Sequence, residues 1–327
     1  KAYVQTEAGY EGYEYTETLS VDVPAYVPDP APDPDPDPDP VTKRVNQLII
    51  NGEMVLDLTG DTVTPETLDA GVMAHNAAGE AIVGTRASFA IANNAGAHNA
   101  IYRGQALGSA VTAAQWAAIE AGTFEDLFIG DYWTINDVNW RIAAFDYYYN
   151  TGDTLCTTHH VTIVPDTALY ETAMNSTQSN AGGYVGSTMY KTGLAQALAT
   201  VKSAFGDDHI LTPRQAFCNA TTSGISSGYG FYDSQIALMT EQNVFGGKFY
   251  GAAKTSTQAP VLMTLDNAQY PLFALDHSRI NVPDKWVGLR DAVSPSNYAR
   301  VTSRGSPDWT SNITNAVAVR PAFSIKA

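Results

Sequence analysis

The sequence predicts an α+β protein built from short strands, a few peripheral helices and long irregular loops. Three observations support this class. Several short segments alternate apolar and polar residues, which is typical of half-buried strands. Helix start and stop signals mark only a few segments, and these lie between the predicted strands. Residues 28–42 consist largely of alternating Pro and Asp, which divides the 327-residue chain into separate modules.

Composition argues against several functional classes. Hydrophobic residues make up 44% of the chain, enough to build cores, whereas charged residues make up 16% and leave a net charge of −16. Because the sequence has no clustered Lys/Arg stripe, we expect no nucleic-acid partner and no adhesion to anionic lipid. No run of about eighteen apolar residues occurs, so we expect no membrane insertion. Cys156 and Cys218 are too few for a disulfide scaffold, and whether they pair stays open.

Two segments precede the first compact module. Residues 1–27 alternate Tyr, Val, Thr and Glu, which predicts an N-terminal arm or anchor that pairs with a partner surface; a disordered terminus is the alternative. Residues 28–42 predict an extended stalk, because Pro fixes φ and forbids helix while the interleaved carboxylates repel one another. Such a stalk would span about 40 Å.

Residues 43–86 predict a small β-rich module. Its strongest signal is a hairpin in which Asn51 and Gly52 form the turn between two apolar runs. A short helix follows, with Thr64 as its cap and Pro65 at its first position.

The end of this module carries a recognisable pattern: Ala74-His75, Gly79 and Ile82-Val83-Gly84-Thr85. The pattern resembles a short repeat found in many bacteriophage tail and fibre proteins. The resemblance implies a fibre module and a structural turn role for His75. Residues 87–100, rich in Ala, Asn and Gly, predict a linker.

Residues 101–327 predict the main domain. Thr112 caps a helix over residues 113–121, and Asn136-Asp137 forms the turn between strands over 126–135 and 138–148. The expected core of this hairpin contains Trp133, Trp140, Ile142 and Phe145. The other predicted elements are strands over 161–164 and 271–275, a helix from Ser187 to Phe205 stopped by Gly206, and helices that begin at Thr212-Pro213 and Asp233.

The C-terminal segment, residues 285–323, combines predicted core residues with a predicted binding surface. The expected core residues are Trp286, Leu289, Val301, Val319 and Phe323. Tyr, Trp, Arg and Asn between them are typical of recognition surfaces, and period-two alternation would turn them outward while Ala299 and Val301 face inward. A polar surface without a ligand is the alternative. The predicted ligand-binding residues are Asn297, Tyr298, Arg300, Thr302, Arg304, Asp308 and Trp309.

Reactive residue types elsewhere give weaker signals. Cys156, His159 and His160, with Asp146 or Asp153, have the side chains of a zinc site, but neighbours in a strand face opposite ways, which favours buried histidines. The carboxylates of Glu125, Asp126 and Asp131 lack the defined pairing that a glycosidase needs and are expected to be surface groups. We therefore predict no catalytic residues, no metal and no cofactor.

The motifs of residues 101–325 resemble a widespread phage and bacterial domain family. The matching residues are Leu127 to Trp133, Asn139 to Ile142, Trp286, Leu289-Arg290, Ala299, Val301, Gly305 and Val319 to Phe323. The resemblance implies a C-type-lectin-like fold of the formylglycine-generating-enzyme branch, which includes phage tropism determinants. The enzymes of that branch use paired cysteines near the C-terminal core, and residues 286–323 contain none. Gly288 and Ala316-Val317-Ala318 depart from the family pattern.

Together these features predict a bacteriophage fibre protein, part of the virion, whose C-type-lectin-like domain at 101–327 binds a host-surface glycan or protein without catalysis. Residues 1–27 would contact other virion subunits, and a homo-oligomer is expected, a trimer by analogy. One alternative is a structural head or tail decoration or assembly protein that contacts only other virion subunits. A bacterial surface adhesin is the third possibility.

Overall fold

The computed structural model describes residues 2–6, 9–13, 46–86, 91–218, 221–222, 225–226, 229–251, 268–310 and 312–327. The chain divides into two compact units, Lys1–Ala90 and Ile91–Ala327. Helices and several sheets together confirm the mixed α+β class. The predicted stalk at 28–42 lies outside the described residues. Among those that are described, no helix has the length and apolar character needed to cross a bilayer.

The N-terminal unit contains a four-stranded sheet in the order β2-β1-β3-β4. Its β3–β4 hairpin confirms the predicted turn, because Asn51 and Gly52 both adopt positive φ, at 53° and 82°. Strands β1 and β2 lie within the predicted arm, and β1 pairs with β3 of the same unit. The strands span Ala2–Thr6, Gly9–Tyr13, Gln47–Ile50 and Glu53–Asp57 in chain order.

The rest of this unit is a 3-10 turn and a small hairpin. η1, Pro65–Thr67, begins after Thr64, as predicted, and β5, Met73–His75, pairs with β6, Ala81–Val83. Among residues 46–86, Leu48 is the one large apolar side chain that is buried. This unit therefore has little core among its described residues.

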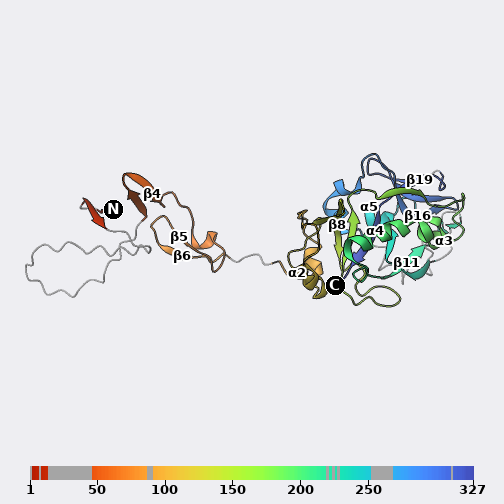
Figure 1. Ribbon diagram of the computed structural model, residues 1–327, viewed down its shortest axis with the longest axis horizontal. Helices are drawn as coiled ribbons and strands as arrows, with labels where there is room; N and C mark the ends of the chain where they lie inside the picture. The colour runs from red at the N-terminus through yellow and green to blue at the C-terminus, as the bar shows by residue number, and fades with distance from the viewer. Residues whose placement is uncertain are drawn as a thin grey trace, which may run out of the picture. The chain divides into compact units, whose positions relative to one another are not determined.

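The C-terminal unit contains two five-stranded sheets (Figure 1). The first has the order β15-β20-β9-β8-β7, and its β7–β8 turn confirms Asn136-Asp137, with φ of 52° and 60°. The first strand of that hairpin begins at Tyr132, later than predicted. The bounds are Tyr132–Ile135 for β7, Val138–Phe145 for β8, Val161–Pro165 for β9, Ile236–Leu238 for β15 and Pro321–Ile325 for β20.

The second sheet has the order β10-β19-β16-β17-β18, which leaves β18 at an edge. Strand β19 belongs to this sheet and β20 to the first, so Arg320, which lies between them, marks the point where the chain passes from one sheet to the other. The bounds are Tyr170–Ala173 for β10, Val287–Ser294 for β16, Asn297–Val301 for β17, Pro307–Trp309 for β18 and Ala316–Val319 for β19.

Short helices and two small β-pairs complete the unit. The Thr112 cap is confirmed, since its hydroxyl accepts from Gln115 N at 3.2 Å, and Gly206 ends α4 as predicted. The helices are α1 Ala95–His98, α2 Ala113–Glu120, α3 Gly183–Gly186, η2 Met189–Gly193, α4 Ala195–Phe205, α5 Glu241–Phe245, α7 Pro271–Leu275 and η3 His277–Ile280. The pairs are β11 Arg214–Cys218 with β14 Tyr229–Asp233, and β12 Thr221–Thr222 with β13 Ile225–Ser226.

Several predicted elements are wrong. Residues 271–275 form α7 and not a strand, because Pro271 suits a helix start and a short apolar run does not distinguish the two. The chain after Thr212-Pro213 forms β11 instead of a helix, and Asp233 ends β14 instead of starting one. The predicted linker at 87–100 is too long, since the second unit begins at Ile91.

The core of the C-terminal unit is centred on aromatic side chains from distant segments. The rings of Trp140, Phe205 and Phe323 lie 5.5 to 5.8 Å apart, measured between centroids. Trp133, Trp140, Ile142 and Phe145 are all buried, which confirms the predicted hairpin core. The last strand, β20, is thus packed in the centre of the unit.

Candidate ligand-binding surface

The predicted binding residues lie on β17, β18 and the turn between them. The hydroxyl of Thr302 closes this turn by accepting from the backbone N–H groups of Arg304 at 3.3 Å and Ser306 at 3.0 Å. Six of the seven predicted side chains are accessible: Arg304 and Trp309 are exposed, and Asn297, Arg300, Thr302 and Asp308 are half-buried.

Tyr298 is the seventh, and its predicted display is wrong. Its side chain is 0% exposed, and its hydroxyl donates to the carbonyl of Gly183 at 3.1 Å. Alternation turns Tyr298 to the face opposite Ala299, but both faces of β17 are covered at this point, since Ala299 is also buried and Tyr298 reaches Gly183 of α3. Tyr298 therefore belongs to the core and not to the binding surface.

Trp286 departs in the opposite direction, since it was predicted as core and is 41% exposed. It lies one residue before β16, whose first six residues are all buried. The guanidinium of Arg300 lies over its ring, 3.8 Å from the centroid. The same guanidinium donates to Asp308 Oδ2 from Nε at 3.0 Å and from the second terminal nitrogen at 2.8 Å. Trp286, Arg300 and Asp308 form one stacked, charge-paired group.

A second group of exposed aromatic residues surrounds Trp309. Trp309 is 40% exposed, and its ring lies 4.7 Å from that of Tyr250 at an interplanar angle of 54°. Tyr250 is 39% exposed and its neighbour Phe249 is 59% exposed. We call Phe249, Tyr250 and Trp309 the aromatic platform. Because neighbouring residues of a strand point to opposite faces, Trp309 and Asp308 leave β18 on opposite sides.

A buried carboxylate holds the loop that carries the platform. Glu241, at the start of α5, is fully buried, and its side chain accepts the backbone N–H groups of Phe249 at 3.1 Å, Tyr250 at 3.1 Å and Gly251 at 2.7 Å. Three successive amides on one carboxylate fix the backbone at the platform. Space is tight at Gly251, where a Cβ would lie 3.0 Å from Glu241 Oε2 and from Asp291 Cβ.

A second carboxylate lies beside Glu241. Asp291 is buried; one of its oxygens accepts the backbone N–H of Glu241 at 2.6 Å and the other lies 3.3 Å from Lys248 Nζ. Burial raises the pKa of Glu241, and the negative charge of Asp291 raises it further, whereas the three amides oppose the shift. The loop therefore depends on the protonation state of one buried acid.

The sequence analysis did not select Glu241, Phe249 or Tyr250. The sequence does carry a signal for the helix that precedes this loop. Thr240 and Asn243 form a capping box at the start of α5, and Gly246 ends the helix in the left-handed conformation, with φ of 75°. Two aromatic residues shortly after such a helix end, as Phe249 and Tyr250 are, are candidates for exposed binding residues. The contact between Glu241 and the loop spans eight to ten residues and has no periodic signature.

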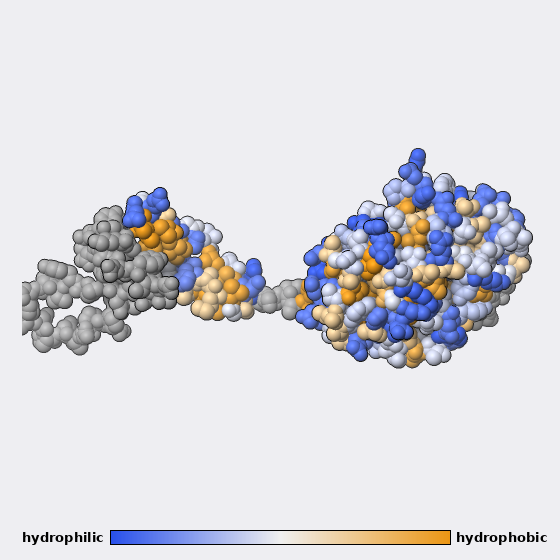
Figure 2. Space-filling model, in the orientation of Figure 1, coloured by the Kyte–Doolittle hydropathy of each residue, from blue (hydrophilic) through white to orange (hydrophobic). Residues whose placement is uncertain are grey.

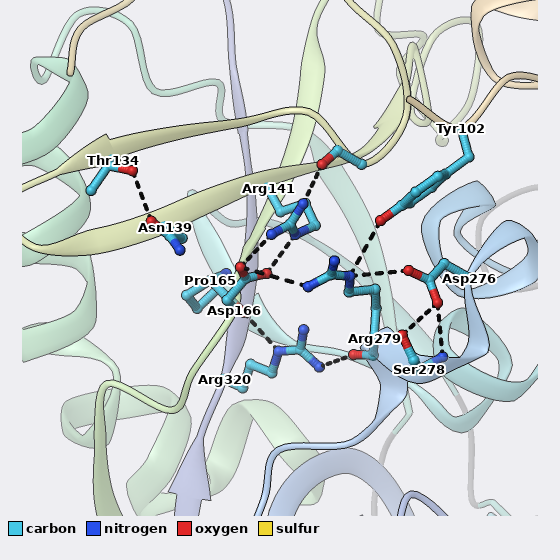
Figure 3. A network of polar contacts seen from close by, with 11 residues as sticks. Tyr102, Thr134, Asn139, Arg141, Pro165, Asp166, Asp276, Ser278, Arg279 and Arg320 are labelled. Carbon is cyan, nitrogen blue, oxygen red and sulfur yellow. Dashed lines mark hydrogen bonds and ion pairs between the residues drawn. The ribbon is translucent and has the colours of Figure 1, made fainter. Parts of the chain in front are cut away.

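Arginines and carboxylates from segments distant in sequence form a polar network (Figure 3). Arg141 Nε donates to Asp166 Oδ1 at 2.6 Å, and a terminal nitrogen of Arg279 lies 4.0 Å from Asp166 Oδ2. Arg279 also contacts Asp276, 3.1 Å from its Nε, and the hydroxyl of Tyr102 at 3.3 Å. The network ties β8, the end of β9 and η3 together.

Arg320 completes this network from the exit motif of the sequence. Its fully buried guanidinium donates to the carbonyl oxygens of Pro165 at 2.7 Å and Arg279 at 2.8 Å. Burial lowers the pKa of Arg320 to about 10; the charges of Arg141 and Arg279 act in the same direction, and Asp166 opposes them. These bonds give Arg320 a structural role at the crossing between the sheets.

The histidines considered as zinc ligands both contact Asp146, whose Oδ1 accepts the backbone N–H of His160 at 2.9 Å. His159 Nδ1 lies 2.7 Å from Asp146 Oδ2, whereas His160 is buried, with Nδ1 2.9 Å from the Thr158 carbonyl and Nε2 accepting the Tyr148 N–H at 3.0 Å. Burial lowers the pKa of His160. No group of three His, Cys, Asp or Glu residues suited to a metal ion occurs in the part of the chain that the structure describes. Cys156 is a free thiol.

The carboxylates considered for glycoside hydrolysis are engaged in the fold. Asp131 was predicted as a surface group and is buried; it accepts the backbone N–H groups of Gln105 at 2.8 Å and Phe128 at 2.9 Å, and pairs with Arg103. Asp126 pairs with the same guanidinium. Both carboxylates therefore stabilise the loop before β7.

Comparison of the chain with protein-family models, curated proteins and solved structures finds no match. The proposals below therefore depend on the geometry of this chain and on the sequence motifs described above.

Proposed function

We propose that this chain is a fibre-like virion protein whose C-terminal unit, of C-type-lectin-like fold, binds a host-surface ligand non-covalently. One observation carries the binding part: Phe249, Tyr250 and Trp309 are large aromatic residues exposed together on a backbone that buried groups hold in place. Clustered exposed aromatic residues on a soluble protein mark interaction sites. The virion part rests on the sequence resemblances of residues 43–85 and 101–325.

A binding role, rather than catalysis, agrees with the bonding of the acidic groups nearby. Glu241 accepts three amides, Asp291 accepts an amide and lies beside Lys248, and Asp308 is paired with Arg300. A general acid or base needs a carboxyl group that reaches the substrate. These carboxylates instead fix the surface that presents the aromatic side chains.

The proposed function can be tested with the full chain, labelled with a fluorophore and added to a panel of bacterial strains. We expect saturable binding to a subset of the strains, displaced by an excess of unlabelled protein and measured by flow cytometry. The absence of saturable binding to every strain of a broad panel would contradict the proposed function.

The N-terminal unit supports the second candidate, a structural protein that contacts other virion subunits. Figure 2 shows apolar surface over its described part. Six large apolar side chains there are 38% to 70% exposed, and Met73 and Val83 face each other across the β5–β6 pair. A module with so little core gains stability by covering such residues with a partner. The six residues are Met54, Val55, Leu56, Val72, Met73 and Val83.

Sedimentation velocity of the full chain tests this second candidate and the expected homo-oligomer together. If copies of the chain cover these residues, the wild type sediments as an oligomer and the Val55→Lys/Met73→Lys variant as a monomer. Glu53→Lys, at an exposed polar position of β4, is the control for the added charge.

A further inference from the structure

We infer that the aromatic platform binds an uncharged saccharide, with the apolar C–H face of a sugar ring against Tyr250 and Trp309. This inference rests on the proposed function and narrows it from any surface ligand to one chemical class at one place. Three properties of the platform lead to it: the shape of its rings, the stiffness of its backbone and the pairing of the charges around it.

The first property is the arrangement of the rings. The indole of Trp309 and the phenol of Tyr250 meet at 54°, so they present two inclined aromatic faces instead of one flat stack. Aromatic faces carry partial negative charge and attract the polarised C–H groups of a pyranose. The phenol hydroxyl and the indole N–H add hydrogen-bonding groups at the edges of these faces. The two inclined aromatic faces of Tyr250 and Trp309 suit a sugar ring that has two apolar C–H patches.

The second property is that both sides of the platform are held before any ligand binds. Phe249 and Tyr250 are fixed through their amides by Glu241. Trp309 is fixed by the pairing of β18 with β17, where it lies opposite Ala299. Saccharides bind weakly per unit area, so a surface that loses little freedom on binding favours them.

The third property is charge. Among the described residues, the charged neighbours of the platform in sequence are Lys248 and Asp308. Lys248 lies beside Asp291, and Asp308, on the side of β18 opposite Trp309, is paired with Arg300. The carboxylate of Glu241 is occupied by the loop amides. A sialic acid, phosphate or ammonium group would have to displace one of these pairs or lose its hydration without compensation. An uncharged sugar neither displaces an ion pair nor loses the hydration shell of a charged group.

The experiment compares four variants of the full chain: Trp309→Ala, Tyr250→Ala, Trp286→Ala and Arg304→Ala. Trp286 is a matched control, because it is also a tryptophan, is 41% exposed against 40% for Trp309, and belongs to the separate group around Arg300. Arg304 is an exposed cation and reports on anionic ligands. The probes are an immobilised panel of neutral hexose and N-acetylhexosamine oligosaccharides, with sialylated, sulfated and phosphorylated counterparts. Thermal unfolding of each variant establishes that it is folded.

We expect wild-type protein to bind members of the neutral panel. Trp309→Ala and Tyr250→Ala should each weaken that binding about tenfold or more, which is typical of a central aromatic contact. Trp286→Ala, outside the platform, should change it less than about twofold.

The saccharide panel can overturn the inference in three ways. One is that no neutral oligosaccharide binds; another is that Trp309→Ala binds as the wild type does. The third is that only charged oligosaccharides bind and Arg304→Ala abolishes their binding. Treatment of the bound cells separates the inference from the proposed function. If protease removes the binding of the wild type and periodate oxidation does not, the ligand is a protein. The proposed function then stands and this inference fails. If no strain is bound, the proposed function fails, and the saccharide panel still decides the inference.

Discussion

The guanidinium of Arg320 donates to the carbonyl of Pro165 at 2.7 Å, at the point where the chain leaves one five-stranded sheet and enters the other. Pro165 ends β9 of the first sheet, and Arg320 follows β19 of the second. This bond, with the one to the Arg279 carbonyl, joins both sheets to η3. It explains why a charged residue sits in the middle of an apolar C-terminal motif.

Replacing Arg320 with Met should destabilise the protein by about 3 kcal/mol or more, because buried carbonyl groups lose their donors and Asp166 loses a neighbouring positive charge. Urea unfolding measures the change. Arg320→Lys keeps a charge but lacks the planar fork, so it should recover only part of the loss. An unchanged unfolding midpoint for Arg320→Met would contradict the structural role.

Glu241→Gln should change the pH dependence of stability. The raised pKa of Glu241 means that the folded state disfavours its ionised form, so this group lowers stability as pH rises above its ordinary value of 4.5. Gln does not ionise; relative to the wild type, the variant should therefore become progressively more stable from about pH 4 to about pH 7. Urea unfolding across this range tests it, and a constant difference between the two proteins would refute the assignment.

Acid should destabilise the protein through His160. Because burial lowers its pKa, the unfolded chain takes up a proton more readily than the folded one, and stability falls as pH drops through the ordinary histidine value of 6.5. His160→Gln should flatten this part of the profile. Urea unfolding from about pH 5 to about pH 8 measures the slope, and an unchanged slope in His160→Gln would contradict this role.

Gly288→Ala should destabilise the protein by about 1–3 kcal/mol, because the added Cβ would lie 2.7 Å from Val317 Cγ2 in the neighbouring strand. Gly186→Ala is the matched control, since nothing lies within 4 Å of the Cβ it would add. Thermal unfolding compares the two. Equal melting temperatures for the two variants would show that β16 and β19 move apart to accommodate the added Cβ at little cost in free energy.

The stack of Arg300 on Trp286 should contribute a coupling free energy of about 0.5–1 kcal/mol, as expected for a partly exposed cation–π pair. A double-mutant cycle with Trp286→Ala and Arg300→Ala measures this coupling by urea unfolding. Additive effects of the two substitutions would show that the stack contributes nothing to stability.

Local signals in the sequence predicted the elements they control. The capping residue Thr112, the turn Asn136-Asp137 and the stop at Gly206 are confirmed because each acts within a few residues of itself. The strand predicted over residues 271–275 was wrong, because five apolar residues fit a buried helix as well as a strand.

The binding surface was harder to predict, because it depends on contacts between distant segments. Strand alternation placed Ala299 and Val301 inward as predicted, but the opposite face of β17 is covered at Tyr298, whose hydroxyl reaches Gly183 of α3. Trp286 was misplaced because it lies one residue before its strand begins.

The position of Trp309 on an edge strand has a consequence for how this chain can vary. Substitutions at the exposed end of β18 leave Trp140 and Phe323 in place, and Glu241 holds its loop through backbone amides that every residue except proline possesses. Selection can therefore replace the side chains of Phe249, Tyr250 and Trp309 almost independently of folding. If the platform binds a ligand as we propose, single substitutions there change the preferred ligand while the scaffold stays constant.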